Sequence, residues 1–241
     1  VERFGSHKAL IRAKGELAEA IPGRGVLIVP ADDPHCEQLV SRASCRVVRV
    51  SSRLVSSRLD ASPEATIRVT EMREDHNGLT VVVDGMQFSA PVHGLHFARS
   101  ILFAIAVGRE VGITDADIAE GLRRFNPVPG RCHFQKIRSW TVIDDTYNSS
   151  PEAMQAAIRL LSRQPTAASR ILVTGDMLEL GASAPGCHEN IGVSAAEAGI
   201  DRVLAVGQFA SHVASNAIAA GIERDRATAF ETIEALCGRL S

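Results

Sequence analysis

Three loops of the 241-residue chain place acidic and amide side chains directly after short apolar runs. They span residues 31–34 (ADDP), 144–150 (DDTYNSS) and 175–181 (GDMLELG). Ligands of parallel α/β sheets bind at the carboxyl ends of the strands, where these loops are expected. Paired aspartates there could hold Mg²⁺ through water or accept hydrogen bonds from ribose hydroxyls. A single aspartate is better explained by an N-cap or an Asx-turn, which needs no ligand. Two adjacent acids beside Tyr147 and Asn148 favour a binding site in the second loop.

Cationic side chains add few further candidates, because only Lys8, Lys14 and Lys136 are lysines. Lys14 lies in an amphipathic pattern, where a lone lysine is normally a solvated charge. Arg131 follows a proline-rich stretch, where its guanidinium could grip a phosphate in bidentate fashion or could simply lie at the surface near a strand. His96 stands at the start of an expected helix, where the positive end of the helix dipole disfavours a protonated ring.

Several functional classes lack their signatures in these residues. The sequence contains no GxxxxGK[ST], no GxGxxG after a strand and no GxSxG. The five cysteines are scattered without a CxxC, and the eight histidines do not cluster at metal-ligand spacing, which favours reduced thiols over disulfides or zinc. A net charge of −2, with no polybasic run and no apolar run of membrane-spanning length, indicates a cytoplasmic protein without nucleic-acid partners or membrane insertion.

The first half of the chain alternates helical and strand patterns. Helices are expected over 8–20, 36–43 and 96–111, and after a Thr114-x-x-Asp117 capping box; strands are expected over 25–30 and 46–50. Leu17 and Phe125 are assigned to buried helix faces by their spacing. Alternating residues over 66–72 and 79–88, joined by His76-Asn77-Gly78, predict a small antiparallel hairpin.

A second β/α series follows the sequence NPVPG at 126–130, whose prolines and glycine forbid regular structure. We place a domain boundary there, giving domains 1–128 and 129–241. Strands are expected over 140–143, 171–174, 203–206 and 227–229, and helices over 151–163, 188–198, 209–220 and the last residues to 240. This rhythm predicts an α/β fold with a second, doubly wound parallel sheet.

The order of short blocks resembles the Mur ligase family. The blocks are ERFGS, AKGE, ADDP, GLH, PGR, IDDTYNSSPEAM and TGDMLELG, followed by a histidine. The resemblance implies the remainder of a P-loop-type central ATPase domain, then a Rossmann-like C-terminal ligase domain. Because the P-loop and the UDP-binding domain are not in the sequence, we expect a fragment of a longer protein. We also expect the C-terminal domain to be incomplete and the chain alone to be inactive.

The resemblance also implies a reaction. ATP and Mg²⁺ would convert a substrate carboxylate into an acyl phosphate, and an amine would attack it to give an amide, ADP and phosphate. The two C-terminal blocks favour the family member of peptidoglycan synthesis that joins D-alanyl-D-alanine to a UDP-linked muramoyl tripeptide. A monomer is the family expectation.

Residue roles follow from the same resemblance. Lys14 corresponds to a carbamylated lysine that ligates Mg²⁺, and Arg131 to a phosphate-contacting catalytic arginine. The nucleotide would be bound by His96, Arg131, Asp145 (through the ribose), Tyr147 and Asn148, and the substrate by Tyr147, Asn148, Ser149, Asp176 and Glu179.

Two alternatives stay open. One is another amide ligase of the superfamily, similar to folylpolyglutamate synthase or cyanophycin synthetase, although the GDMLELG block argues against it. The other is a degenerate, non-catalytic nucleotide-binding module. It is supported by Pro30, Phe97 and Ser100, which stand where the family pattern has asparagines.

Overall fold

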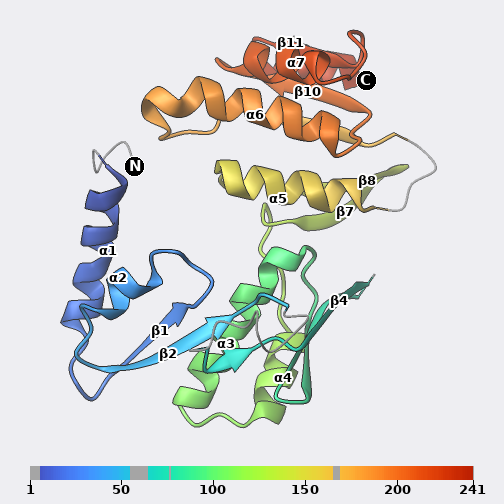
Figure 1. Ribbon diagram of the computed structural model, residues 1–241. Coiled ribbons are helices and arrows are strands. Elements are labelled where there is room, and N and C mark those ends of the chain that lie inside the picture. Colours follow the sequence, from blue (N-terminus) through green and yellow to red (C-terminus); the bar gives the residue numbers. More distant parts are fainter. Residues whose placement is uncertain (1–5, 55–64, 76, 165–168, 241) are drawn as a thin grey trace. The chain divides into compact units, whose positions relative to one another are not determined.

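The computed structural model describes residues 6–54, 65–75, 77–164 and 169–240 (Figure 1). Residues 2–5 of the ERFGS block and the turn residue His76 lie outside these ranges. The chain divides into two compact units, one ending at Val128 and the other beginning at Pro129. Within the described ranges, no helix is both long and apolar enough to cross a membrane.

The first unit contains a parallel and an antiparallel sheet, each of three strands. Its elements in chain order are α1 (His7–Ala20), β1 (Val26–Pro30), α2 (Cys36–Val40), β2 (Arg46–Ser51), β3 (Ile67–Arg68), β4 (Glu71–Asp75), β5 (Gly78–Val83), β6 (Met86–Ala90), the 3₁₀ turn η2 (Leu95–Phe97), α3 (Ala98–Glu110) and α4 (Asp115–Arg123). The parallel sheet has the order β1-β2-β3 and the antiparallel sheet the order β4-β5-β6. The predicted mixed α/β fold is therefore confirmed.

The core of the first unit lies between helix α3 and the two sheets. Ala98, Ile101, Leu102 and Ile105 form the predicted apolar stripe of α3, and all four are buried. They join the inward-facing residues of the sheets, which include Val50, Val81 and Phe88. The side chain of Thr114 accepts a hydrogen bond from the Asp117 amide, as the predicted capping box requires, so α4 begins where expected.

The antiparallel part differs from the predicted hairpin. Residues 79–88 are two strands rather than one, because the chain turns at Asp84-Gly85, where φ is 52° and 79°. Two successive positive φ angles are the geometry that Asp-Gly supplies in a tight hairpin turn. The stretch 66–72 is likewise divided, since β3 pairs in parallel with β2 and β4 pairs antiparallel with β5. In the sequence, the alternation of apolar and polar residues continues on both sides of each break, so the pattern did not reveal where one strand ends and the next begins.

Two residues assigned to buried helix faces are exposed. Leu17 is 70% exposed, because α1 buries its small residues Gly15 and Ala18 instead. The Arg42 side chain lies over Gly15, where an added Cβ would come within 2.3 Å of its Nη1. Phe125 is 46% exposed because α4 ends at Arg123, so the helical spacing that predicted its burial no longer applies.

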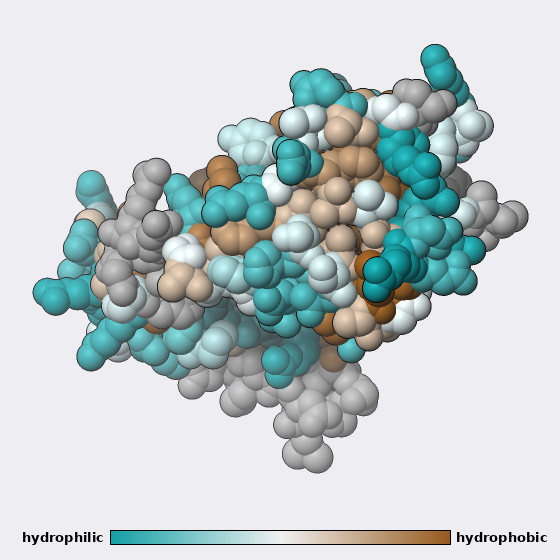
Figure 2. Space-filling view, turned by 90° about the horizontal axis from the view of Figure 1, so that it is seen from above, coloured by the Kyte–Doolittle hydropathy of each residue, from teal (hydrophilic) through white to brown (hydrophobic). Residues whose placement is uncertain are grey.

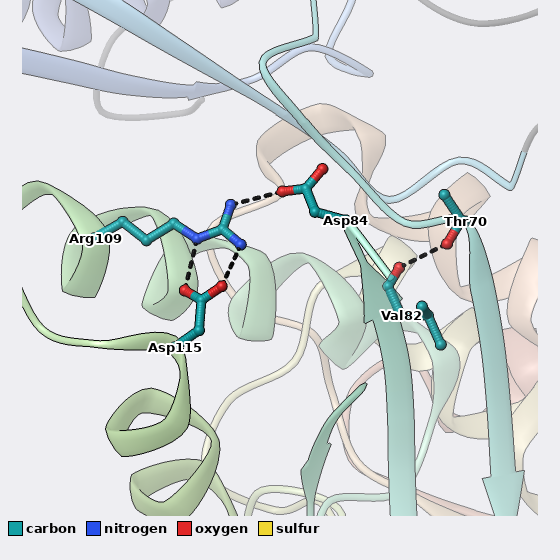
Figure 3. A network of polar contacts seen from close by, with 5 residues as sticks. All are labelled: Thr70, Val82, Asp84, Arg109 and Asp115. Atoms are coloured by element: carbon teal, nitrogen blue, oxygen red, sulfur yellow. Dashed lines mark hydrogen bonds and ion pairs between the residues drawn. The ribbon is translucent and has the colours of Figure 1, made fainter. Parts of the chain in front are cut away.

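Arg109 joins three elements of the first unit at one end of α3 (Figure 3). Its Nε and Nη2 donate to the two carboxylate oxygens of Asp115, both at 2.8 Å, and its Nη1 donates to Asp84 at 2.8 Å. The bidentate hydrogen bonds lower the pKa of Asp115 against the opposing effect of its desolvation. Arg109 thus connects the end of α3 to the start of α4 and to the β5–β6 turn.

The second unit contains a three-stranded parallel sheet and a two-stranded hairpin. Its elements are β7 (His133–Ile137), β8 (Trp140–Asp144), α5 (Pro151–Ser162), β9 (Ile171–Thr174), the 3₁₀ turn η3 (Gly181–Ser183), α6 (Ala184–Glu197), β10 (Arg202–Val206), α7 (Ala210–Ala219), β11 (Ala227–Phe230) and α8 (Ile233–Leu240). Strand β7 was missed by the sequence analysis. It pairs with β8 through a turn in which Arg138 has a φ of 55°, without the glycine or asparagine that usually signals such a turn.

Helices α6 and α7 pack against each other and connect strands that follow one another in the sheet order β9-β10-β11. Right-handed crossovers in one direction place both helices on the same face of such a sheet. Their contact is close at Gly192, where an added Cβ would lie 2.2 Å from the carbonyl oxygen of Val213.

Some apolar side chains of the second unit remain exposed, for example Val173 of β9, which is 50% exposed. Figure 2 shows one face of the molecule, on which hydrophobic residues gather between hydrophilic ones.

The Arg109 network predicts a pH-dependent loss of stability. Arg109→Met should destabilise the first unit by about 1 to 2 kcal/mol at pH 7, because two carboxylates lose their partner. The pKa of Asp115 is lowered in the fold, so its contribution is present above the unfolded carboxyl pKa of about 4 and disappears as the pH falls through the folded value. Urea unfolding followed by circular dichroism should show the effect shrinking below about pH 4. Asp84→Asn, at a more exposed partner, is the control with the smaller expected effect.

The α6–α7 contact predicts that two alanine substitutions in one helix differ strongly. Gly192→Ala should destabilise the second unit by about 2 to 3 kcal/mol, because the new methyl group meets backbone atoms that cannot move aside independently. Gly186→Ala has open space around the added Cβ and should leave stability unchanged or raise it by at most about 1 kcal/mol. Urea unfolding monitored by the single tryptophan, Trp140 in β8, measures both. Equal changes in stability for the two variants would contradict the close approach of α6 and α7 at Gly192.

Candidate functional site

The predicted site residues are distributed over both units. Lys14 and His96 belong to the first unit, and all the others belong to the second. Lys14 is exposed on α1 and makes no hydrogen bond or ion pair with the described residues. Its side chain is therefore accessible to solvent. The role assigned to Lys14 stays a prediction.

His96 lies in the turn η2, immediately before helix α3. Its ring is exposed and lies 4.4 Å from the ring of Phe97. The ring also folds back over Gly94, whose φ is 109° and where an added Cβ would come within 2.5 Å of the His96 ring. Phe97 packs against the core of the first unit, which accounts for an apolar residue at this position. The nucleotide-binding role of His96 is likewise untested by this geometry.

The first acidic loop holds strand ends together. The carboxylate of Asp32, just after β1, accepts hydrogen bonds from the Ser51 hydroxyl and from the Ser52 amide, both at 2.7 Å. Asp33 accepts a hydrogen bond from the His35 amide at 2.8 Å, which is an Asx-turn. Both aspartates of the ADDP loop therefore have internal partners that account for their positions.

The second acidic loop packs against the PGR block in the second unit. The Tyr147 amide donates to the Gly130 carbonyl at 3.0 Å, and Gly130 has a φ of 75°. Beyond this contact the guanidinium carbon of Arg131 lies 4.1 Å from the centre of the Tyr147 ring, a cation–π stack. Both side chains are exposed, with Tyr147 at 68%. The two loops thus present a positioned guanidinium and an aromatic ring to solvent.

Asp145 connects the same two segments from the other side. Its Oδ1 accepts a hydrogen bond from the Cys132 amide at 3.1 Å. Cys132 is buried and has a φ of 47°, a left-handed conformation that is uncommon for cysteine. The Asp144 carboxylate accepts from the amide and hydroxyl of Thr146 at 3.2 and 2.7 Å. Asp145 is therefore a partly buried carboxylate beside the Arg131–Tyr147 pair, with one oxygen already engaged.

The remaining polar residues of this loop lead into helix α5. Asn148 accepts a hydrogen bond from the Ser149 amide at 2.9 Å. Ser150 is the N-cap of α5, and its hydroxyl accepts from the Ala153 amide at 3.2 Å. Pro151 follows in the first turn, where its missing N–H costs no hydrogen bond. The structure thus brings Arg131, Asp145, Tyr147, Asn148 and Ser149 into one continuous surface segment.

The third loop, GDMLELG, is held by its own aspartate. The Asp176 carboxylate accepts hydrogen bonds from the amides of Gln208 and Phe209 at 2.8 and 3.0 Å, just before helix α7. The approach is close, because a Cβ at Gly207 would lie 2.5 Å from this carboxylate. Met177 is buried, whereas Glu179 is exposed and has a φ of 61°. Both oxygens of Asp176 are thus engaged within the protein, and Glu179 is the acid that the loop presents.

The described residues do not form an all-protein cage for a metal ion. They contain no group of three or more His, Cys, Asp or Glu side chains placed to bind a metal. Mg²⁺ commonly keeps several waters and takes only one or two protein ligands beside substrate phosphates. A single carbamylated lysine would meet that requirement, whereas an all-protein cage is not formed by these residues.

Two family descriptions match the chain. The Mur ligase middle domain matches residues 1–108, and the Mur ligase glutamate ligase domain matches residues 130–240. The chain belongs to the Mur ligase family, as its sequence blocks predicted.

Individual relatives refine this assignment. The chain is 35% identical to the UDP-N-acetylmuramoyl-tripeptide–D-alanyl-D-alanine ligase of Escherichia coli (strain K12), over 92% of this chain and 48% of that protein. It is 28% identical to the crystal structure of MurF from Acinetobacter baumannii, with a TM-score of 0.82 over 98% of this chain and 49% of that one. A folylpolyglutamate synthase from Thermotoga maritima shares the fold alone, with a TM-score of 0.57 at 15% identity over 96% of this chain and 53% of that one. The chain spans about half the length of these relatives.

Asp176 and Glu179 are predicted to respond differently to loss of charge. Asp176→Asn should destabilise the second unit by about 1 to 3 kcal/mol, because an amide group in place of one carboxylate oxygen cannot accept the amide hydrogen bond made there. Glu179→Gln, in the same loop but exposed, should stay within about 0.5 kcal/mol of the parent. Thermal unfolding followed by circular dichroism compares them. If Asp176→Asn left the thermal stability unchanged, the carboxylate would not be what holds the loop.

Proposed function

We propose that the native polypeptide carrying this sequence is an ATP-dependent amide ligase of peptidoglycan precursor synthesis. It would join D-alanyl-D-alanine to a UDP-linked muramoyl tripeptide in the cytoplasm, as a monomer. The observation that carries the proposal is the 35% identity to the Escherichia coli enzyme of that name, which extends through both units. We also propose that residues 1–128 are the later part of the ATPase domain and residues 129–241 the ligase domain.

The reaction has two steps. A carboxylate oxygen of the tripeptide attacks the γ-phosphorus of ATP, the bond to the β-phosphate oxygen breaks, and ADP leaves. The amine of D-alanyl-D-alanine then attacks the acyl carbon, inorganic phosphate leaves, and the nitrogen loses a proton. Both steps develop charge on phosphoryl oxygens, so their rates depend on fixed cations and on positioning.

The residues of the second unit suit these steps. Arg131, which lies over the Tyr147 ring, would meet a phosphoryl group with a guanidinium that this contact already positions. Asp145 would accept hydrogen bonds from the ribose through the oxygen that Cys132 leaves available. Tyr147, Asn148 and Ser149 would line the nucleotide and the incoming amine. Glu179 would contact the dipeptide, and Asp176 would support that contact by holding the loop.

In the first unit, His96 would lie at the nucleotide, and Lys14 would act as a carbamate. A carbamate is an anionic oxygen ligand of the kind that Mg²⁺ prefers, and addition of CO₂ to the neutral amine of Lys14 would form it. Bound Mg²⁺ would neutralise charge on the γ-phosphate. Lys14 would then position the ion, whereas Arg131 would position the phosphoryl group.

A second candidate is a nucleotide-binding module without turnover. One observation favours it: Phe97 packs against the core of the first unit, so position 97 itself offers the nucleotide no polar side chain. Such a module would still use Arg131, Asp145 and Tyr147 for binding. The two candidates differ in whether ADP is released.

The ligase proposal predicts a specific pattern of activity. The native polypeptide should release ADP with the UDP-linked tripeptide and D-alanyl-D-alanine together, and much less when D-glutamate or L-lysine replaces the dipeptide. Arg131→Ala and Lys14→Ala should each lower kcat by about 100-fold or more, because each removes charge stabilisation of the transferring phosphoryl group. Lys136→Ala, at an exposed lysine of β7, is the matched control and should retain activity.

The same assay separates the alternatives. Nucleotide binding without ADP release from any combination would favour the binding module. ADP release with glutamate and a folate, but not with the dipeptide, would favour another ligase of the superfamily. Restoration of Lys14→Ala activity by short carboxylic acids would support the carbamate, because a free carboxylate can replace it.

A further inference from the structure

His188 is a buried polar side chain to which the proposed reaction gives no role. It lies in α6 and is 1% exposed, among the apolar residues around α6 and α7. Its Nδ1 lies 2.7 Å from the Ala184 carbonyl, and its Nε2 lies 2.9 Å from the Met177 amide. A carbonyl can only accept and an amide can only donate, so the ring proton must be on Nδ1 and Nε2 must accept. The contacts therefore define a single tautomer.

The His188 ring also belongs to a closed set of contacts. It stacks on the Phe209 ring, with centroids 4.7 Å apart and an angle of 22° between the planes. The Phe209 amide donates to Asp176, which directly precedes Met177 in the chain. The two stacked residues thus hold two consecutive residues of the GDMLELG loop. The Phe209 amide donates to the Asp176 carboxylate, and the His188 ring accepts from the Met177 amide. Loss of either hydrogen bond would release one end of this pair.

The anchored amide lies where the loop changes from a buried to an exposed side chain. The Met177 side chain is buried at 2% exposure, whereas the following Leu178 is 74% exposed. Glu179 comes next and is exposed with a left-handed backbone. The change from buried to exposed occurs at the residue whose amide His188 holds. The hydrogen bond thus lies immediately before the two residues that the loop exposes.

We propose that His188 is a positioning residue, which holds the Met177 amide and thereby fixes Leu178 and Glu179 for contact with the amine substrate. The ligand class is a small dipeptide with an apolar side chain and a free ammonium group. Leu178 offers it an apolar surface, and Glu179 offers it a carboxylate. The substrate part rests on the function proposed above, whereas the positioning of the loop does not.

The tautomer can be measured on the unaltered chain. Long-range ¹⁵N–¹H correlation spectra of the His188 ring should show a protonated Nδ1 and an unprotonated Nε2. The Met177 amide should exchange slowly with solvent, since it is buried and hydrogen-bonded. A ring protonated at Nε2, or a rapidly exchanging Met177 amide, would overturn the proposal without any substitution.

Two substitutions separate the hydrogen bond from the volume of the side chain. His188→Leu fills the space but offers no acceptor, and it should speed exchange of the Met177 amide by about tenfold or more. His188→Gln can place a carbonyl oxygen near the position of Nε2 and should restore slow exchange. His212→Gln is the control: this histidine of α7 is paired with Glu189 and lies beside Phe209 but makes no hydrogen bond to the Met177 amide, so exchange of that amide should stay unchanged. Equal exchange in the leucine and glutamine variants would overturn the role of the acceptor.

The same variants in the native polypeptide test the substrate contact. His188→Leu should raise KM for D-alanyl-D-alanine by about tenfold and leave KM for ATP within about twofold, and His188→Gln should restore the dipeptide KM. If the parent protein is active, an unchanged KM for the dipeptide, or an equal rise in the KM for ATP, would overturn the inference. An inactive parent would instead overturn the proposed function, and the spectra would then decide the positioning role alone.

Discussion

Carboxylates that accept backbone N–H groups hold each acidic loop of this protein to its neighbour. Asp32 accepts from Ser52, Asp145 from Cys132, and Asp176 from Gln208 and Phe209. Backbone amides at loop ends have no partner in a sheet or helix, and leaving a buried one unsatisfied costs about 1 to 3 kcal/mol. The aspartates meet this requirement with a charged acceptor, which makes a stronger hydrogen bond than a neutral one.

This constraint divides the polar residues into two groups. Asp32 and Asp176 have both carboxylate oxygens engaged within the protein, so they support the loops from inside. Arg131, Tyr147 and Glu179 are exposed on the loops so supported, and they are the groups that a ligand can reach. The chemistry proposed for the chain therefore depends both on the exposed side chains and on the carboxylates that hold their loops in place.

The extent to which the sequence predicted these features differs between elements. The apolar stripe of α3 and the Thr114 cap were predictable because helical period and capping are local properties. Strand β7 and the Asp84-Gly85 break were missed, since strand pairing depends on residues brought together only in the fold. His188 stood at the end of the family pattern, yet nothing in its neighbours along the chain signals that its ring meets the Met177 amide. Tertiary hydrogen bonds of this kind leave no local signature.

The chain order of β9, β10 and β11 matches their spatial order, with α6 and α7 between them. Each strand consequently pairs with the strand that precedes it, and each helix packs on the helix that follows or precedes it. Register partners such as Ile171 and Arg202, or Val203 and Ala227, are separated by a single β/α crossover, so each pairing closes a shorter loop than a crossover that skips a strand. Each β/α unit of this sheet therefore pairs with the unit that directly precedes it in the chain, and no later segment has to insert between two strands.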